Sequence, residues 1–505
     1  MKSKFSKWSR KSKKLLKQRL KHDESDVRTE PVFTASNIRL DYSERISAIS
    51  CGGIGAVHML VKKIGLDQVI DSELSLLKVH KPYRESDHIL NMIYNIVCGG
   101  RCPEDIELLR NNATYMDAIG ADRIPDPTTA GDFLRRFGYD DIVTLMDVQN
   151  RINRKLWSIA PRNTLEKDAI IDVDGMVVGT YGETKEKMDM SYKGIWGFVP
   201  LIITEATTGL HLYTIHRSGN QVSHSGAVPW IDKSIELVRD RFRRVHLRGD
   251  SDFSLTENFD GWDADGVEFY FSFDSLPNLV EKAFLLPENR WKKFDSVRRR
   301  AVKTKPRGKK RNVKKEVIKR RGYENRERVR EYMAEFDYRP NKCEKPYRMI
   351  AIKRELKVEK GQLRLEDETR YFFYVTNNRE MSAEEVVRFQ HGRCNHENKI
   401  EQLKNGVRAM KNPAAEFFAS WAYMVICSMA WNVKSWMALV MQDEEARSKL
   451  IRMEYKRFKN YFINIPCQII KTGRTIVYRI LNYTPWTETF WSTFHSIREF
   501  KFAST

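Results

Sequence analysis

Two periodicities of apolar residues divide the chain into helix-forming and sheet-forming regions. Between residues 30 and 160, apolar side chains recur at the three-to-four spacing of helices, whereas from 168 onward β-branched residues alternate with polar ones. The alternating stretches are AIIDVDGMVVGTYG, GFVPLIITEAT, GLHLYTIHR and RRVHLRGDSDF, with a helical pattern over 228–242 before the last. Strands interrupted by a helix in this order predict an α/β fold with a mixed sheet.

The pattern of apolar and polar residues changes along the chain, and these changes predict its domain organisation. One predicted domain, the core, is built from two separate stretches. Six segments are expected: a basic N-terminal arm (1–30), a helical and DNA-binding region (31–160), the first part of a catalytic core (161–265), a β-rich basic insertion (266–374), the second part of the core (375–441) and a C-terminal region (442–505).

The longest apolar run, from Phe417 to Met441, is interrupted by Asn432 and Lys434. The uninterrupted part is too short for a bilayer, so the run predicts a buried core helix and no membrane association. The basic N-terminus has no apolar stretch of signal-peptide length behind it. Seven scattered cysteines indicate a reducing compartment, and the close pair Cys98 and Cys102 is expected to be free thiols and not a zinc site.

The charge of the chain indicates a polyanionic partner. Its 88 Lys and Arg outnumber 67 Asp and Glu, which gives a net charge of +21. Nucleic acid suits such a balance, although a merely basic protein would have it too. The region between Arg290 and Arg330 is densely basic and is either a disordered linker or a set of strands with basic loops. Strand-like segments at 347–352 and 370–376 favour the second interpretation. The segment 127–137 contains two adjacent arginines and fits either a DNA backbone contact or bundle packing.

The stretch from Ser382 to Gly406 predicts one capped helix with a charged face. Ser382 and Glu385 form a capping-box pattern, and Gly406 is a suitable stop. A single face of this helix carries Arg393, Glu397, Glu401 and Lys404. Two interpretations fit this face: a solvated stripe of ion pairs, or a carboxylate that helps to hold a metal with cations beside it for phosphate.

Three carboxylates distant in sequence are the candidate catalytic residues. Asp172 and Asp174 point to one side of their predicted strand, Asp250 ends a later strand, and Glu397 lies on the predicted helix. Carboxylates that converge repel one another unless a hard cation lies among them, and Mg²⁺ prefers oxygen ligands. A pair of such ions activates water for in-line phosphoryl transfer. Either aspartate of the first strand fits this geometry.

At these residues the chain resembles the DDE transposases of bacterial insertion sequences. The resemblance covers about 165 to 432, and five blocks occur in the family's order. They are Asp172-Val173-Asp174, Tyr192-Lys193-Gly194 with Gly197-Phe198 and Pro200-Leu201, Arg217-Ser218-Gly219-Asn220, Leu247-Arg248-Gly249-Asp250-Ser251, and the helix signature with Arg393, Glu397 and Lys404.

The resemblance implies a ribonuclease H-like mixed sheet, interrupted by the β-rich insertion, with helical N- and C-terminal regions. It implies Asp174, and not Asp172, as the first metal ligand, together with Asp250 and Glu397, for Mg²⁺ or Mn²⁺. Arg393 and Lys404 are expected to contact phosphates of the DNA end. The other DNA-binding candidates are Arg217, Asn220, Lys193 and Trp291.

Three positions need separate comment. Trp291 is either a core residue or the tryptophan with which relatives hold a flipped base. Met176 stands where the family often has threonine, and Gln390 stands at the tyrosine of the helix signature. Both departures affect the expected fine positioning of the site, and all three metal ligands are present.

The resemblance implies a bacterial, cytoplasmic transposase. It is expected to bind element ends and target DNA, both double-stranded, as a homodimer on paired ends, and to cleave and transfer strands. Two alternatives remain: a transposase-derived DNA-binding protein without cleavage activity, and a metal-dependent DNA nuclease.

Overall fold

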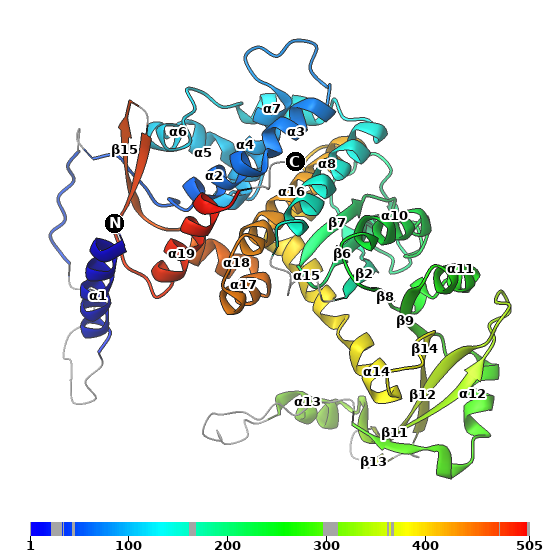
Figure 1. The fold of residues 1–505 in the computed structure, drawn as a ribbon. Coiled ribbons are helices and arrows are strands. Elements are labelled where there is room, and N and C mark those ends of the chain that lie inside the picture. Colours follow the sequence, from blue (N-terminus) through cyan, green and yellow to red (C-terminus); the bar gives the residue numbers. More distant parts are fainter. Residues whose placement is uncertain are drawn as a thin grey trace. The chain divides into compact units, whose positions relative to one another are not determined.

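The chain folds into two compact units that are each built from separate stretches of sequence (Figure 1). Unit 1 comprises Met1–Glu166, Val177–Gln221 and Lys399–Thr505, and unit 2 comprises Lys167–Met176 and Val222–Asn398. The computed structural model describes residues 2–21, 33, 35–42, 46–160, 168–295, 312–360, 363–364, 368–473 and 475–501. The end of the predicted basic arm (22–30) and the basic runs at 298–300 and 309–311 lie outside these ranges.

Unit 2 is organised by a mixed sheet. Its parallel part consists of β2 (Ala169–Gly175), β8 (Val245–Gly249) and β9 (Val267–Phe273), in that order. Parallel neighbours require crossover connections. The connection from β2 to β8 contains α10 (Val228–Arg239), and the connection from β8 to β9 contains α11 (Phe259–Ala264). Apolar residues such as Ile171, Leu247 and Phe269 are completely buried, as expected for a sheet covered on both faces.

The strands of the predicted insertion continue this same sheet. β14 (Glu368–Thr376) pairs antiparallel with β9, and β12 (Tyr347–Lys360), β11 (Glu324–Tyr338) and β10 (Lys292–Phe294) follow in order. A short strand, β13 (Leu363–Arg364), also pairs with β12. Two helices accompany these strands, α12 (Pro277–Phe284) and α13 (Val313–Arg321). The insertion is therefore rich in strands, and β9 joins it to the parallel part.

The helix predicted over 382–406 is interrupted, so the prediction of one continuous helix was wrong. α14 (Ala383–His391) begins with the predicted capping box of Ser382 and Glu385, and α15 (Cys394–Asn405) ends before Gly406. Between them, Gly392 and Arg393 form a turn. The four charged residues therefore do not share one uninterrupted helical face.

Unit 1 is mainly helical, as the apolar spacing predicts. Its central helix is α16 (Phe417–Leu439), which is buried along nearly its whole length and packs against α8 (Tyr139–Trp157) and α4 (Glu85–Cys98). Further helices in the described part of unit 1 are α2 (Ile54–Ile64), α3 (Leu66–Glu73), α5 (Ile106–Arg110), α6 (Ala113–Ile119), α7 (Pro127–Leu134), α17 (Glu444–Ile451), α18 (Tyr455–Phe458) and α19 (Thr487–Glu499).

The predicted hairpin is present in unit 1, and helix side chains cover it. β6 (Leu201–Glu205) pairs antiparallel with β7 (Leu210–Ile215), and Gly209 adopts φ 72° at the turn. Asn432 of α16 accepts from the backbone N–H of His211 at 2.8 Å and donates to its carbonyl at 2.9 Å. Lys434 donates to the Ile451 and Met453 carbonyls at 3.0 and 2.7 Å. Both polar interruptions of the apolar run thus bind backbone groups inside the fold.

Unit 1 also contains two small sheets. β3 (Val178–Gly179), β5 (Trp196–Phe198) and β4 (Asp189–Met190) form one, and β1 (Ala48–Ile49), β15 (Cys467–Thr472) and β16 (Thr475–Ile480) form the other. No helix in the described part of the chain is long and apolar enough to cross a membrane.

The basic N-terminus forms a helix, α1 (Lys2–Arg19), that packs on α19. The ring of Phe5 stacks on Trp491 with centroids 4.1 Å apart, and Ser9 donates to Glu488 at 2.6 Å. The lysines and arginines of α1 whose side chains are described are exposed. One face of the helix is therefore anchored by aromatic contact, and the basic residues are left in solvent.

Candidate active site

The carboxylates of unit 2 lie where β2 and β8 end. Because these strands are parallel neighbours with Asp172 opposite Arg248, their carboxyl ends meet at the same edge of the sheet. Asp174 is the penultimate residue of β2, and Asp250 follows β8 directly as the N-cap of a short 3₁₀ helix, Ser251–Phe253. The side chain of Asp250 accepts from the Asp252 backbone N–H at 3.1 Å.

Arg393 connects two of the carboxylates. Its Nη1 lies 3.0 Å from Asp174 Oδ2 and its Nη2 lies 3.2 Å from Glu397 Oε1. The side chains of Arg393 and Asp174 are 14% and 11% exposed, whereas that of Glu397 is 57% exposed. The turn between α14 and α15 thus directs a cation into the sheet edge, and Glu397 follows it on the first turn of α15.

Burial and nearby charges shift the pKa values of two of the carboxylates, Asp174 and Asp250. Burial raises the pKa of Asp174 to about 7, Arg393 opposes this shift, and the nearby charges of Asp250 and Glu397 add to it. Burial also raises the pKa of Asp250, with the same opposition from Arg393 and further increases from Asp252 and Glu397. Residues separated by up to 223 positions therefore act on one another directly.

Asp172 is already engaged by another residue. It is 1% exposed, and Arg248 donates to both of its carboxylate oxygens, at 2.7 Å from Nε and 3.0 Å from Nη2. A carboxylate bound in this bidentate manner is neutralised within the sheet. Of the two aspartates on this face of β2, Asp174 is the one that faces Arg393.

The donor set suits a hard divalent cation, but the carboxylates are not arranged around one. Asp174, Asp250 and Glu397 offer only oxygen atoms, as Mg²⁺ prefers. Within the described ranges, no three His, Cys, Asp or Glu side chains are gathered closely enough to hold a metal ion. The guanidinium of Arg393 lies between two of the three carboxylates and partly offsets their charge.

Four of the predicted DNA-binding residues belong to unit 1. Lys193 is exposed at the turn between β4 and β5, with its Nζ 5.2 Å from the centroid of the Tyr192 ring, and Lys404 and Asn220 are also exposed. Arg217 differs from them because burial lowers its pKa to about 10 and its Nε donates to the Val199 carbonyl at 2.8 Å. Arg217 is thus bound to the backbone of its own unit.

Gly219 of the same block is required by packing. A Cβ at this position would lie 2.1 Å from the Asp189 carbonyl oxygen and 2.6 Å from that of Gly197. Since backbone atoms cannot give way, the Arg-Ser-Gly-Asn turn lies directly against the small β3–β5–β4 sheet.

Trp291 lies at the start of β10 in the insertion and is half-buried. Its ring centroid is 6.0 Å from that of Tyr371, and Lys353 Nζ is 5.6 Å from the ring. The insertion therefore holds this ring against one aromatic side chain and one cation without covering it completely.

Sequence reasoning missed two residues that join the elements of the site. Arg248 binds Asp172, and its Nη1 also donates to the Phe389 carbonyl at 2.7 Å. Gln390 is 3% exposed and donates to the Gly249 carbonyl at 3.2 Å and to Ser272 Oγ at 2.9 Å. The period of two on β8, which places Arg248 on the same side as Asp250, was the available signal for the first. Gln390 occupies the position of the family's tyrosine, and its side chain serves the packing of α14.

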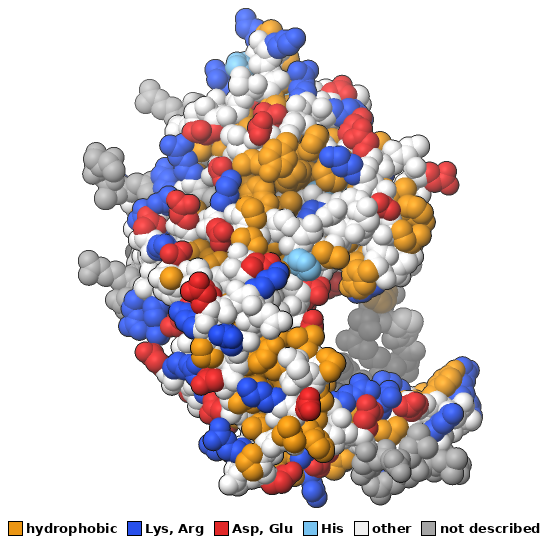
Figure 2. Space-filling view, turned by 90° about the vertical axis from the view of Figure 1, so that its right-hand side faces the viewer, with side chains coloured by type: hydrophobic (Ala, Val, Ile, Leu, Met, Phe, Trp, Pro, Cys, Tyr) orange, Lys and Arg blue, Asp and Glu red, His pale blue; other side chains and the backbone are white. Residues whose placement is uncertain are grey.

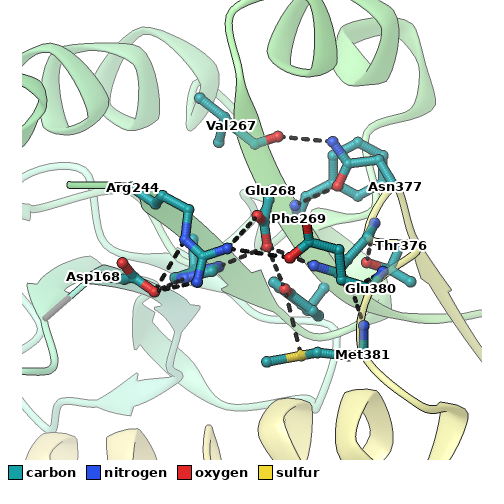
Figure 3. A network of polar contacts seen from close by, with 12 residues as sticks. Asp168, Arg244, Val267, Glu268, Phe269, Thr376, Asn377, Glu380 and Met381 are labelled. Carbon is teal, nitrogen blue, oxygen red and sulfur yellow. Dashed lines mark hydrogen bonds and ion pairs between the residues drawn. The ribbon is translucent and has the colours of Figure 1, made fainter.

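A second polar network occupies the opposite end of the same strands (Figure 3). Arg244 donates to Asp168 at 2.9 Å, and His246 lies 3.0 Å from Asp168 and 3.2 Å from Glu268. Hydrogen bonding with His246 is the main cause that lowers the pKa of Glu268, to about 2, against the effect of burial, and Tyr270 donates to the same carboxylate. Each charged side chain drawn in this network pairs with a side chain of opposite charge. The network therefore serves to stabilise this end of the strands.

A family model described as "Transposase DDE domain group 1" matches residues 32–502. The solved structures that match include a cryo-electron microscopy structure of a piggyBac transposase synaptic complex with hairpin DNA. That chain is 11% identical, the match covers 82% of this chain and 81% of that one, and the TM-score is 0.33. No curated protein sequence gives a match.

Proposed function

Since the chain belongs to the DDE transposase family, whose model matches residues 32–502, we propose that it is an active transposase. It binds the ends of a mobile DNA element and catalyses metal-dependent strand cleavage followed by strand transfer into target DNA. The observation that carries this proposal is that Asp174 and Asp250 lie at the same edge of the sheet, where Arg393 pairs with both Asp174 and Glu397. The parallel strands that hold the two aspartates also agree with a ribonuclease H-like core.

Asp174, Asp250 and Glu397 are the proposed ligands of Mg²⁺, for which Mn²⁺ can substitute. Such an ion, when bound, activates water or a 3′ hydroxyl and stabilises the leaving oxygen in phosphoryl transfer. The residues themselves supply three oxygen ligands on a rigid sheet edge and on the adjoining helix. Burial of Asp174 excludes water from the deep side of this site, while the exposure of Glu397 leaves the other side open to a DNA strand.

Arg393 has two proposed positions in this function. In the free chain it balances Asp174 and Glu397. With divalent cations on the carboxylates, its guanidinium would be free to bind a phosphate of the DNA end, for which a planar fork of donors is suited. Lys404, Lys193 and Asn220 are the proposed further DNA contacts, with Arg217 holding the loop before Asn220 in place.

Long-range attraction for DNA is supported by the net charge of +21 and by the exposed basic residues of α1. On the face drawn in Figure 2, basic side chains are spread among acidic ones. The binding of DNA is therefore proposed to rest on particular segments, and its affinity should fall steeply with salt because each phosphate contact releases counterions. A homodimer on paired ends is part of the same proposal.

Cleavage of DNA ends tests this function. The substrate is a duplex that contains the short inverted repeats flanking the gene, incubated with the full chain and Mg²⁺ or Mn²⁺. We expect wild-type protein to nick the end and join it to a second duplex, and Glu397→Gln to bind the end without cutting it. Glu401→Gln is the matched control, because Glu401 lies one turn further along α15 and bonds to Asn405.

Two outcomes of the same assay would replace the proposal. If both the wild type and Glu397→Gln bind the ends and neither cuts them, the chain is a transposase-derived DNA-binding protein. The arginine between the carboxylates, in place of a ready metal site, is the observation that favours this second candidate. If the wild type cuts but never forms joined products, the chain is a metal-dependent nuclease.

A further inference from the structure

Arg248 links three elements next to the proposed active site, β8, β2 and α14. It is 5% exposed and belongs to β8, which leads into Asp250. Its Nε and Nη2 hold Asp172 on β2, and its Nη1 donates to the carbonyl of Phe389 on α14. The guanidinium also lies 4.8 Å from the centroid of the Phe389 ring. Each end of this planar group therefore has a defined partner.

The partners of Arg248 lie next to the residues of the site in sequence. Asp172 precedes Asp174 by two positions on one face of β2, and Arg248 precedes Asp250 by two. Asp172 and Arg248 are direct neighbours across the parallel pair. Residues two positions apart on a strand move together. A shift of the Asp172–Arg248 ion pair therefore displaces Asp174 and Asp250 relative to each other.

The contact of Arg248 with Phe389 also affects the position of Arg393, which lies in the turn after α14. The turn after α14 carries Gly392, where a Cβ would lie 2.6 Å from Arg248 Nη1 and 2.9 Å from the Phe389 carbonyl oxygen. A return contact comes from α14, since Gln390 donates to the carbonyl of Gly249 at 3.2 Å. Two reciprocal hydrogen bonds thus fix the end of α14 to the end of β8, directly before Arg393 and Asp250.

We propose that Arg248 is a positioning residue for the reaction: through Asp172 and the Phe389 carbonyl it sets the distances among Asp174, Asp250 and Glu397. It touches neither DNA nor metal. The inference rests on the proposed function, and it assigns to this residue a role beyond stabilising the sheet. Lysine cannot take over this role, because a single ammonium cannot donate in parallel to a carboxylate and reach a third acceptor at the opposite end.

The chain contains a matched ion pair that separates positioning from simple stability. Arg244 and Asp168 are 76 positions apart, as are Arg248 and Asp172, and they also bridge the start of β8 and the residue before β2. That pair lies four residues earlier on each strand, in the network of Figure 3, away from the carboxylates of the site. Replacing it perturbs the same two strands and leaves the proposed site untouched.

The test compares Arg248→Lys with Arg244→Lys in the full-length chain. Mn²⁺ affinity is measured without DNA by electron paramagnetic resonance, thermal unfolding gives stability, and cleavage is followed at saturating Mn²⁺ and DNA. We expect Arg248→Lys to weaken Mn²⁺ binding and to slow cleavage by about 10- to 100-fold each, as loss of supporting contacts around metal ligands does. Affinity for the DNA end should stay within about 3-fold, since a positioning residue acts on the ligands and makes no phosphate contact. Arg244→Lys should lower the melting temperature by less, because the Arg244 side chain is 36% exposed against 6% for Arg248, and should leave Mn²⁺ affinity and cleavage near wild type.

Asp172→Asn gives a second route if Arg248→Lys does not fold. It keeps the shape of the side chain and one acceptor oxygen, so the expected loss of Mn²⁺ affinity has the same direction and is smaller. Equal effects of the Arg248 and Arg244 substitutions, or unchanged Mn²⁺ affinity in both Arg248→Lys and Asp172→Asn, would overturn the positioning role. A wild type that binds Mn²⁺ but cuts no DNA would overturn the proposed function and leave this role standing. A wild type that binds no Mn²⁺ would overturn both.

Discussion

Arg393 reaches Asp174 across 219 positions of sequence, with 3.0 Å between Nη1 and Oδ2, and its other terminal nitrogen lies 3.2 Å from Glu397. A cation of the chain itself thus lies among carboxylates that are proposed to hold Mg²⁺. Because both cations favour the same charged oxygens, binding of Mg²⁺ and retention of this ion pair compete. In the proposed function, the affinity for Mg²⁺ would therefore depend partly on how easily Arg393 leaves the carboxylates.

Replacement of this arginine should make stability depend more strongly on metal. Arg393→Gln removes a largely buried partner of Asp174, so the metal-free protein should lose about 1–3 kcal/mol of unfolding free energy. Added Mg²⁺ should then raise the melting temperature of the variant more than that of the wild type, because the vacated carboxylates bind it more tightly. Differential scanning fluorimetry over a Mg²⁺ titration measures both effects.

Arg388→Gln is the control for this experiment. Arg388 lies on α14, one turn before the break, and pairs with Glu384 at the surface. Its replacement should change stability by less than about 1 kcal/mol and leave the response to Mg²⁺ unaltered. An identical Mg²⁺ response in Arg393→Gln and the wild type would show that the arginine does not compete with metal.

Acid should weaken unit 2 through Glu268. Its pKa is lowered from the ordinary 4.5 to about 2, chiefly by His246. A depressed carboxyl pKa contributes stability that is complete above about pH 4.5 and is lost as the pH falls toward 2. The free energy of unfolding should therefore fall over this range by about 1–3 kcal/mol more in the wild type than in Glu268→Gln. Urea unfolding between pH 3 and pH 6 provides the comparison.

The variant still accepts the hydrogen bond from Tyr270, so the comparison isolates the charge of Glu268. Glu281→Gln on the exposed side of α12 should follow the wild-type curve at every pH. Parallel curves for the wild type and Glu268→Gln would show that the Figure 3 network does not hold this carboxylate in its charged form.

The two periodicities predicted most of what lies close in sequence. Asp172 and Asp174 share one face of β2, the β6–β7 hairpin turns at Gly209, and the capping box starts α14 where Ser382 predicts it. Each of these features depends on contacts within a few residues. Their physical causes are therefore readable from a short window of sequence.

Features that depend on distant contacts were not predicted. The guanidinium of Arg248, 144 positions earlier, fills the space beside Gly392 in the turn between α14 and α15, and no local pattern could predict this contact. The strands of the insertion alternate like any others, so their continuation of the sheet through β14 and β9 could not be read either. Asn432 was recognised as a polar interruption, but its backbone partner His211 lies 221 positions away.

If Trp291 holds a flipped base, one of the two roles that the sequence leaves open, its replacement should selectively affect DNA with unpaired bases. Its ring is half-buried against Tyr371 and accessible on the remaining surface. Trp291→Ala should weaken binding to an end that carries one unpaired base near the cleavage position by about 1–3 kcal/mol, the usual worth of one base stacked on an aromatic ring. Fluorescence anisotropy with paired and unpaired ends measures the difference.

Trp291→Phe separates stacking from folding. It retains an aromatic face and should recover most of the affinity for the unpaired end, while binding to the fully paired end stays constant in both variants. Equal weakening for both kinds of DNA would mean that Trp291 serves the packing of β10 and holds no base.

In Gly392→Ala, two effects on stability oppose each other: the higher helix propensity of alanine and the close contact of its Cβ with Arg248. The glycine has φ −57° and ψ −20°, which alanine adopts without strain, so propensity alone would stabilise the chain by roughly 0.5–1 kcal/mol. The new Cβ, however, would lie 2.6 Å from Arg248 Nη1 and 2.9 Å from the Phe389 carbonyl oxygen, and a buried arginine with three acceptors cannot withdraw freely. We expect the second effect to dominate, with lower stability and cleavage slowed by about 10-fold or more. Gly131→Ala on α7, whose Cβ would meet its nearest atom at 3.7 Å, should show the stabilisation alone. A Gly392→Ala protein as active and as stabilised as Gly131→Ala would mean that Arg248 yields easily and does not hold the turn before Arg393.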